Sequence, residues 1–209
     1  GSGPQVDIHI EKRIPVCAGL GGGSADAAAV LHAMNALTGA ALPVETLAEA
    51  GMQVGSDVPF CVLGGTALAE GRGERLTPLP ALPECHVVIC KPPFPISTPK
   101  LFAQVDVRRI SRRPDTAGLI AALEGQDLPG VARRLYNVFE DVLDPRQRSQ
   151  ICAIKAALID CGALGASMSG SGPSVFGLFD RAEAAQSAYG QLARRFRDTF
   201  LCKTIGTVC

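Results

Sequence analysis

The stretch from Pro15 to Ala25, Pro-Val-Cys-Ala-Gly-Leu-Gly-Gly-Gly-Ser-Ala, places four glycines within five residues. Glycine adopts backbone conformations that other residues avoid, and it lets a ligand come close to the main chain. Ser24 is a favourable cap for a predicted helix that ends at Gly39 and carries its apolar residues on one face: Ala27, Val30, Leu31, Met34 and Leu37. Free N–H groups and the positive end of the dipole meet at a helix N-terminus. The stretch therefore favours a phosphate-binding loop over a plain turn, although plain turns are the commoner use of glycine-rich segments.

Two familiar phosphate-binding motifs fit this stretch poorly. A Walker A loop needs Gly-Lys-Ser/Thr before its helix, and no lysine lies between Lys12 and Lys91. The dinucleotide fingerprint is nearly spelled by Gly19, Gly21 and Ser24, but its last position is serine, and a proline interrupts the segment before it. The pattern therefore indicates a phosphate loop of another class.

Asp57 stands in Gly55–Phe60, Gly-Ser-Asp-Val-Pro-Phe, a turn that is predicted to enter an apolar strand over 60–63. An aspartate in a turn commonly caps the backbone. A carboxylate here would also suit a hydroxyl that attacks the γ-phosphate, because phosphoryl transfer depends on positioning and on one acid near the nucleophile. The residues alone leave both roles open.

A second turn of small residues runs from Ser169 to Gly172, between two strand-like runs within 165–179. The simplest structure for this pattern is a hairpin. Its functional interpretation is a second backbone loop, which closes over the phosphates from another domain.

The remaining elements of the first half are predicted from periodicity and from turn residues. Val6, Ile8 and Ile10 alternate with polar residues, which is typical of a half-buried strand. A helix over 44–50 has Pro43 in its first turn and Gly51 at its end, and a hairpin follows over 64–74. Three prolines within 76–83 mark a connector and a domain boundary near Glu84.

The second half is predicted to begin and end with strands, over 86–90 and 200–208. Helices are predicted after a cap at Ser97 or Thr98 and over 115–123, 128–136, 145–161 and 181–195. An apolar stripe is expected to lie in the core; it comprises Leu135, Val138, Phe139 and Val142. The paired arginines at 108–109 and 112–113 are expected on a solvated face.

The composition narrows the class of protein. Lysine and arginine together number 20, as do aspartate and glutamate, so the formal net charge is +0 and no basic excess indicates nucleic acid or an anionic membrane as a partner. No apolar run approaches the roughly 18 residues of a membrane span. The eight cysteines include no Cys-x-x-Cys pair, which favours reduced thiols in the cytoplasm over disulfides or zinc.

Three motifs, in the right order, resemble one family. Pro-x-x-x-Gly-Leu-Gly-Gly-Gly-Ser with its alanine-rich helix resembles the ATP loop of the GHMP kinases, named for galactokinase, homoserine kinase, mevalonate kinase and phosphomevalonate kinase. Met168–Pro173 resembles the third motif of that family. Gly-Leu-Gly-Gly-Gly-Ser-Ala-Asp-Ala-Ala, Gly-Ser-Asp-Val-Pro-Phe and Gly-Gly-Thr-Ala-Leu-Ala-Glu-Gly-x-Gly-Glu look most like the branch that acts on 4-diphosphocytidyl-2-C-methyl-D-erythritol.

The resemblance implies an α+β fold of two domains. Residues 1–83 would form an ATP-binding domain, N-terminally incomplete and like the second domain of ribosomal protein S5, and residues 84–209 a ferredoxin-like domain. The implied activity is transfer of phosphate from ATP, with Mg²⁺, to the 2-hydroxyl of this small-molecule substrate, in the non-mevalonate route to isoprenoid precursors. Asp57 would be the catalytic acid/base and Ser24 a Mg²⁺ ligand. The residues implied to bind ATP are Pro15, Val16, Cys17, Ala18, Gly19, Leu20, Gly21, Gly22, Gly23, Ser24 and Ala25, with Gly170, Ser171 and Gly172 lining the site.

One departure from the family pattern leaves alternatives open. Family members begin upstream with a first motif that carries a catalytic lysine and the residues that hold the cytosine, and Lys12 does not match that lysine. A chain that starts at Gly1 is expected to turn over weakly or not at all and to expose a sheet edge. The alternatives are another GHMP kinase, of homoserine or mevalonate type, and a non-catalytic nucleotide-binding module. No oligomeric state is implied.

Overall fold

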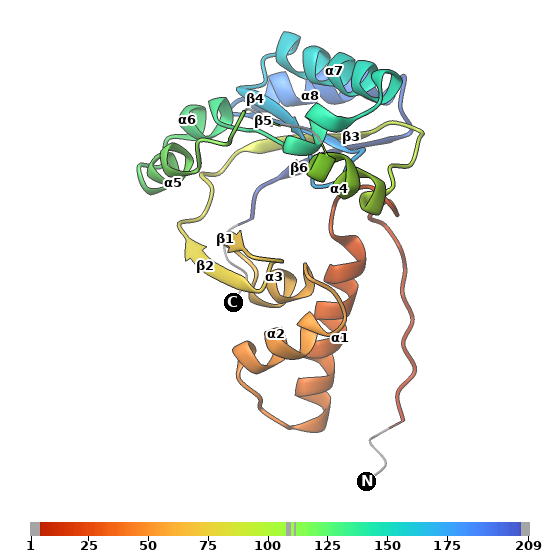
Figure 1. Ribbon diagram of the computed structural model, residues 1–209, viewed down its shortest axis with the longest axis vertical. Helices are drawn as coiled ribbons and strands as arrows, with labels where there is room; N and C mark the ends of the chain where they lie inside the picture. Colours follow the sequence, from red (N-terminus) through yellow and green to blue (C-terminus); the bar gives the residue numbers. More distant parts are fainter. Residues whose placement is uncertain (1–4, 108–109, 111, 206–209) are drawn as a thin grey trace. The chain divides into compact units, whose positions relative to one another are not determined.

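The computed structural model describes residues 5–107, 110 and 112–205 of the 209-residue chain, which divide into two compact units (Figure 1). Within these residues, unit 1 comprises 5–16 and 21–79, and unit 2 comprises 17–20 and 80–205. The division falls between Leu79 and Pro80, and it assigns four residues of the glycine-rich stretch to unit 2. The domains predicted at 1–83 and 84–209 stay a prediction. The arginine pair 108–109 and the last residues of the predicted final strand lie outside the described part of the chain.

Unit 1 is built from three helices and a two-stranded hairpin in the part of the chain that the structure describes (Figure 1). Its core is small and forms where the helices meet, around Ala28, Leu47, Val58 and Val62. The elements are α1 (Gly22–Thr38), α2 (Val44–Met52), α3 (Val58–Leu63), β1 (Thr66–Glu70) and β2 (Arg75–Leu79). The hairpin is antiparallel, as predicted, but its second strand extends into the proline-rich segment that was expected to be a connector.

The helix after the glycine-rich stretch is confirmed, but its start differs from the prediction. Helix α1 begins at Gly22, so Ser24 lies inside its first turn and is not the cap. The cap is Gly21, whose φ of 63° is the left-handed conformation that glycine adopts without strain, and whose carbonyl accepts a hydrogen bond from the Ala25 N–H at 2.9 Å. Gly39 ends the helix as predicted, with a φ of 64°.

The predicted start of the next helix is confirmed, but the helix ends two residues later than predicted. Helix α2 runs from Val44 to Met52, so Pro43 precedes it rather than filling its first position. Gly51 is buried inside the helix and does not end it. A Cβ atom at Gly51 would lie 2.7 Å from Cγ1 of Val58, so the glycine serves the close approach of α2 and α3.

Two predicted strands of unit 1 are not strands. Residues 5–14 form neither helix nor ladder with any described residue, and Val6, Ile8 and Ile10 are exposed. Alternation records which side chains share a face, whereas a strand also needs a neighbour for its backbone hydrogen bonds. The apolar run after Asp57 is helix α3, because a run this short fits either structure and Pro59 is well tolerated in a first helical turn.

Unit 2 contains an antiparallel sheet with strands in the order β4-β5-β3-β6. The strands are β3 (His86–Lys91), β4 (Gly165–Met168), β5 (Val175–Phe179) and β6 (Asp198–Lys203). A helical segment separates β3 from β4, a hairpin joins β4 to β5, and a helix precedes β6, which is the β-α-β-β-α-β arrangement of ferredoxin-like domains. The predicted ferredoxin-like fold is confirmed. The last strand begins and ends earlier than the predicted 200–208.

Helices cover both faces of this sheet. Helices α7 (Pro145–Asp160) and α8 (Ala182–Ala193) pack over one face, where Val88, Ile154 and Phe179 belong to the main core (Figure 1). Helices α5 (Thr116–Glu124) and α6 (Leu128–Arg133) lie at the other side, where Ala132 of α6 packs with Leu178 in a smaller cluster. These helices and α4 (Thr98–Val107) confirm the predicted elements within a few residues. Among the described helices, none is both long and apolar enough to cross a bilayer.

Candidate active site

The first half of the predicted phosphate loop packs against the Ser169–Gly172 loop within unit 2. Cys17 and Gly19 have positive φ angles of 52° and 70°, and Ala18 between them is buried. The Ala18 carbonyl accepts a hydrogen bond from the Ser174 N–H at 3.2 Å, and the Gly19 carbonyl accepts one from the Ser169 hydroxyl at 2.7 Å. Cys17–Leu20 is therefore held by its backbone carbonyls.

The glycines of these two segments allow their close approach. A Cβ atom at Gly19 would lie 2.1 Å from the Ser169 carbonyl oxygen and 2.7 Å from the Gly172 nitrogen, distances that no side chain tolerates. Gly170 and Gly172 both have positive φ, and a Cβ at Gly172 would meet the Met168 sulfur at 2.5 Å. The structure thus brings Cys17–Leu20 and Gly170–Gly172 together, two of the segments that sequence reasoning assigned to ATP.

The Ser169–Gly172 loop leaves two backbone donors free. The Gly172 N–H is used by the Ser169 carbonyl at 2.8 Å, whereas the N–H groups of Gly170 and Ser171 have no acceptor among the described residues. Gly170 is exposed and Ser171 is half-buried. Successive free N–H groups in a tight turn form a concave surface that favours anions.

The second half of the predicted loop opens helix α1 in unit 1. Helix α1 has no side-chain cap and no acidic residue in its first turn. The N–H groups of Gly22, Gly23 and Ser24, at the positive end of this 17-residue helix, therefore have no acceptor among the residues that the structure describes. A Cβ at Gly23 would meet no atom within 4 Å, so this part of the backbone is open. Asp26, which also belongs to α1, forms an ion pair with the ammonium group of Lys12, which precedes the helix.

Asp57 is exposed at the residue that precedes helix α3, and its carboxylate makes no capping hydrogen bond. The turn-capping interpretation of its side chain is therefore wrong. Burial raises the pKa of the neighbouring Cys61 thiol, and the negative charge of Asp57 raises it further. The Asp57 carboxylate therefore accepts no hydrogen bond from the N-terminus of helix α3. A proton acceptor needs such an uncommitted carboxylate.

Sequence reasoning missed the side chains that hold the Ser169–Gly172 loop. The Asn137 amide donates to the carbonyls of Met168 and Gly170, both at 2.8 Å, and the Thr98 hydroxyl donates to the Ser171 hydroxyl at 2.8 Å. From the sequence, Asn137 could be predicted only as a local helix cap, because the carbonyls that it binds lie 31 and 33 residues further along the chain.

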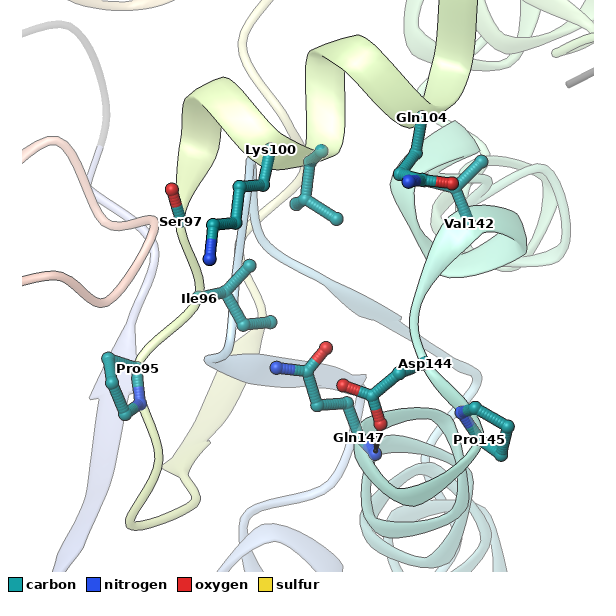
Figure 2. A pocket seen from close by; sticks show the side chains of 10 residues that line it. Pro95, Ile96, Ser97, Lys100, Gln104, Val142, Asp144, Pro145 and Gln147 are labelled. Carbon is teal, nitrogen blue, oxygen red and sulfur yellow. Dashed lines mark hydrogen bonds between the residues drawn. The ribbon is translucent and has the colours of Figure 1, made fainter. Parts of the chain in front are cut away.

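A cavity of about 620 Å³ lies in unit 2 beside helix α4 (Figure 2). Ile96, Leu101 and Val142 supply buried apolar walls, and Figure 2 shows the Lys100 side chain reaching into the cavity from α4 and the Gln147 side chain from α7. The lining residues are Pro95, Ile96, Ser97, Lys100, Leu101, Gln104, Val142, Asp144, Pro145 and Gln147. Ile96 connects this cavity with the loop, since a Cβ at Gly172 would lie 3.1 Å from its Cδ1 atom.

Two parts of the sequence match known domain families. Residues 1–65 match the GHMP kinases N terminal domain, and residues 119–198 match the GHMP kinases C terminal family. With the ferredoxin-like unit and the glycine-rich loop, these matches define the class of protein: a two-domain GHMP kinase. GHMP kinases use ATP as their phosphate donor.

Individual relatives narrow the family. The chain is 44% identical to the 4-diphosphocytidyl-2-C-methyl-D-erythritol kinase of Exiguobacterium sibiricum over 201 residues, which is 96% of this chain and 70% of that protein. It is 45% identical to the enzyme of the same name from Syntrophomonas wolfei, over 94% of this chain and 68% of that one. The chain belongs to the family of 4-diphosphocytidyl-2-C-methyl-D-erythritol kinases.

Solved structures of this family and of another GHMP kinase share the fold. The crystal structure of 4-(cytidine 5'-diphospho)-2C-methyl-D-erythritol kinase matches with a TM-score of 0.77 at 34% identity, over 92% of this chain and 68% of that chain. A homoserine kinase from Cytophaga hutchinsonii matches with a TM-score of 0.74 at 26% identity, over 94% and 68%. The predictions of the GHMP kinase fold and of this kinase family are confirmed.

Proposed function

We propose that this protein transfers the γ-phosphoryl group of ATP to the 2-hydroxyl of 4-diphosphocytidyl-2-C-methyl-D-erythritol, a step of the non-mevalonate route to isoprenoid precursors. Membership of the kinase family supports the reaction and the substrate. The observation that carries the site is the glycine-rich stretch itself: its carbonyls at Ala18 and Gly19 accept hydrogen bonds from Ser174 and Ser169, and its next residues open α1 without a side-chain cap.

The ATP phosphates would be bound by backbone N–H groups. Free donors are available at Gly22–Ser24 in unit 1 and at Gly170 and Ser171 in unit 2. Such donors bind phosphate through hydrogen bonds and the helix dipole, and they need no lysine of the Walker type. Pro15–Ala25 is accordingly proposed as the ATP loop, with Gly170–Gly172 as the second phosphate loop.

Ser24 is proposed as the protein ligand of Mg²⁺. Ser24 is half-buried in the first turn of α1, and its hydroxyl makes no hydrogen bond to a described residue. Mg²⁺ in kinases is typically held by few protein oxygens and by the substrate phosphates. In the described part of the chain, no group of three or more acidic, histidine or cysteine side chains is arranged to hold a metal ion. The ion would neutralise charge on the phosphates when bound.

Asp57 is proposed as the general base. A carboxylate that accepts no hydrogen bond from its own helix can accept one from the substrate hydroxyl, orient that hydroxyl and take its proton during transfer. We place the reaction in the cytoplasm, because all seven cysteines in the described ranges are free thiols.

The test is a coupled assay of ADP release with ATP, Mg²⁺ and 4-diphosphocytidyl-2-C-methyl-D-erythritol, with homoserine and mevalonate run in parallel. Turnover with the cytidyl substrate alone is expected. In Asp57→Asn, kcat should fall by roughly two to four orders of magnitude, whereas the Kd for ATP should stay near that of the wild type. Asp160→Asn, at an exposed aspartate that ends α7, serves as the matched control and should leave both values unchanged. An active Asp57→Asn enzyme would exclude the general-base role, and turnover of homoserine or mevalonate instead would exclude the substrate.

A further inference from the structure

Asn137 uses both ends of its amide on backbone groups of unit 2. Its Oδ1 accepts the Phe139 N–H at 3.0 Å and caps the 3₁₀ helix η1 (Val138–Val142). Its Nδ2 donates one hydrogen to the Met168 carbonyl and the other to the Gly170 carbonyl, each at 2.8 Å. The two carbonyls flank Ser169, so one side chain holds the start of the Ser169–Gly172 loop on both sides of that residue.

Glu140, one turn further along, binds the strand end that leads into the same loop. Its Oε1 accepts the Met168 N–H at 2.8 Å and the Ser167 hydroxyl at 3.2 Å. Its other oxygen pairs with the ammonium of Lys155 from α7. Asn137 and Glu140 together thus hold the main chain at Met168 through both its carbonyl and its N–H.

The Ser169–Gly172 loop passes this restraint on to the glycine-rich stretch. The Ser169 hydroxyl donates to the Gly19 carbonyl at 2.7 Å, and the main chain of the two loops is in such close contact that Gly19 has no room for a Cβ. Every hydrogen bond in this sequence of contacts, from Asn137 to Gly19, lies within unit 2. A displacement at Gly170 would therefore also displace Cys17–Leu20.

We propose that Asn137 is a positioning residue of the nucleotide site. This proposal rests on the proposed kinase function. The Asn137 amide fixes the Ser169–Gly172 loop, and that loop in turn fixes Cys17–Leu20. Asn137 acts through backbone carbonyls and does not need to touch ATP. Its effect is preorganisation, since the free N–H groups of Gly170 and Ser171 point in a productive direction only while the carbonyls on either side of Ser169 are held.

Asn137→Asp is the sharpest test, because it keeps the shape and the Oδ1 acceptor and replaces the double donor with an oxygen that faces two carbonyls. Loss of two hydrogen bonds lowers the populated fraction of the competent loop, so the Kd and KM for ATP should rise about 10–100-fold at pH 8. The KM for the alcohol substrate should change little. At pH 6 the introduced carboxyl group, once protonated, donates one hydrogen again, so part of the ATP affinity should return, and no such recovery should occur in the wild type.

Two further variants separate positioning from folding. Asn137→Ser retains a cap for η1 but is too short to reach both carbonyls, so it should fold and weaken ATP binding without the recovery at low pH. Asn35→Asp is the matched control: Asn35 also binds backbone through both ends of its amide, to Leu42 between α1 and α2, at 3.1 and 2.9 Å. It should lower the melting temperature and leave the Kd for ATP unchanged.

Binding of ATP is measured by calorimetry without the alcohol substrate, so the outcome does not depend on the identity of that substrate. If the wild type binds ATP but phosphorylates none of the tested alcohols, the proposed function fails and the role of Asn137 is still decided by these Kd values. An unchanged Kd in Asn137→Asp and Asn137→Ser overturns the proposal. The proposal is also overturned if Asn137→Asp loses the same ATP affinity as Asn35→Asp and this loss does not depend on pH. A wild type that binds no nucleotide overturns it as well.

Discussion

Gly19→Ala tests the contact between the two glycine-rich loops. The added Cβ would lie 2.1 Å from the Ser169 carbonyl oxygen and 2.7 Å from the Gly172 nitrogen, so the loops must separate. Separation breaks two hydrogen bonds, Ser169 Oγ to the Gly19 carbonyl and Ser174 N–H to the Ala18 carbonyl, each worth about 1 kcal/mol. The φ of +70° adds about 1–2 kcal/mol for a residue with a side chain. We expect a loss of roughly 3–4 kcal/mol in the free energy of unfolding.

The chain offers a control with the same backbone conformation and no contact. Gly39 ends helix α1 with a φ of +64°, and a Cβ there meets nothing within 4 Å. Gly39→Ala should therefore cost only the conformational part, about 1–2 kcal/mol, and should leave ATP binding unchanged. The difference of about 2 kcal/mol between the two variants measures the loop contact alone.

The assay is urea unfolding of both variants and the wild type, followed by titration with ATP. Gly19→Ala should also lose ATP affinity, because Cys17–Leu20 is no longer held by the second loop. Equal free energies of unfolding for Gly19→Ala and Gly39→Ala would refute the steric argument. Normal ATP affinity in a destabilised Gly19→Ala protein would show that the contact supports the fold and not the site.

Two further predictions concern packing and ionisation away from the loops. Gly51→Ala should lower the free energy of unfolding by about 1–3 kcal/mol, because its Cβ would lie 2.7 Å from Val58 Cγ1. In urea unfolding, a chain with both Gly51→Ala and Val58→Ala should lose less than the sum of the two single losses. Additive losses would contradict the contact. Burial raises the pKa of the Cys90 thiol to about 11. The unfolded thiol ionises first, so this contribution to stability is complete below about pH 9 and is lost as the pH rises to about 11. Unfolding of Cys90→Ala between pH 8 and 11 should show a smaller decline than the wild type; identical declines would exclude the effect.

The helices and hairpins illustrate how far periodicity and turn residues carry a prediction. Helices with a clear start and stop, such as the one that Gly39 ends, were predicted within a few residues, because caps and apolar spacing are local properties. The two hairpins were predicted for the same reason, since glycine-rich turns between apolar runs are also local signals. Short apolar runs failed: 58–63 is a helix, and 6–14 has no ladder in the described structure.

The sequence by itself determined the family through its three motifs, and the resemblance to that family implied the ferredoxin-like second half. It also placed the glycines of the site, because left-handed backbone conformations favour glycine and therefore show in the sequence. Tertiary structure decided what those glycines meet. The contact of Gly19 with Ser169, and the hold of Asn137 on Gly170, join residues 150 and 33 positions apart. Such pairs depend on the order of strands in the sheet, β4 beside β5 and β3 next to it, and no local pattern contains that order.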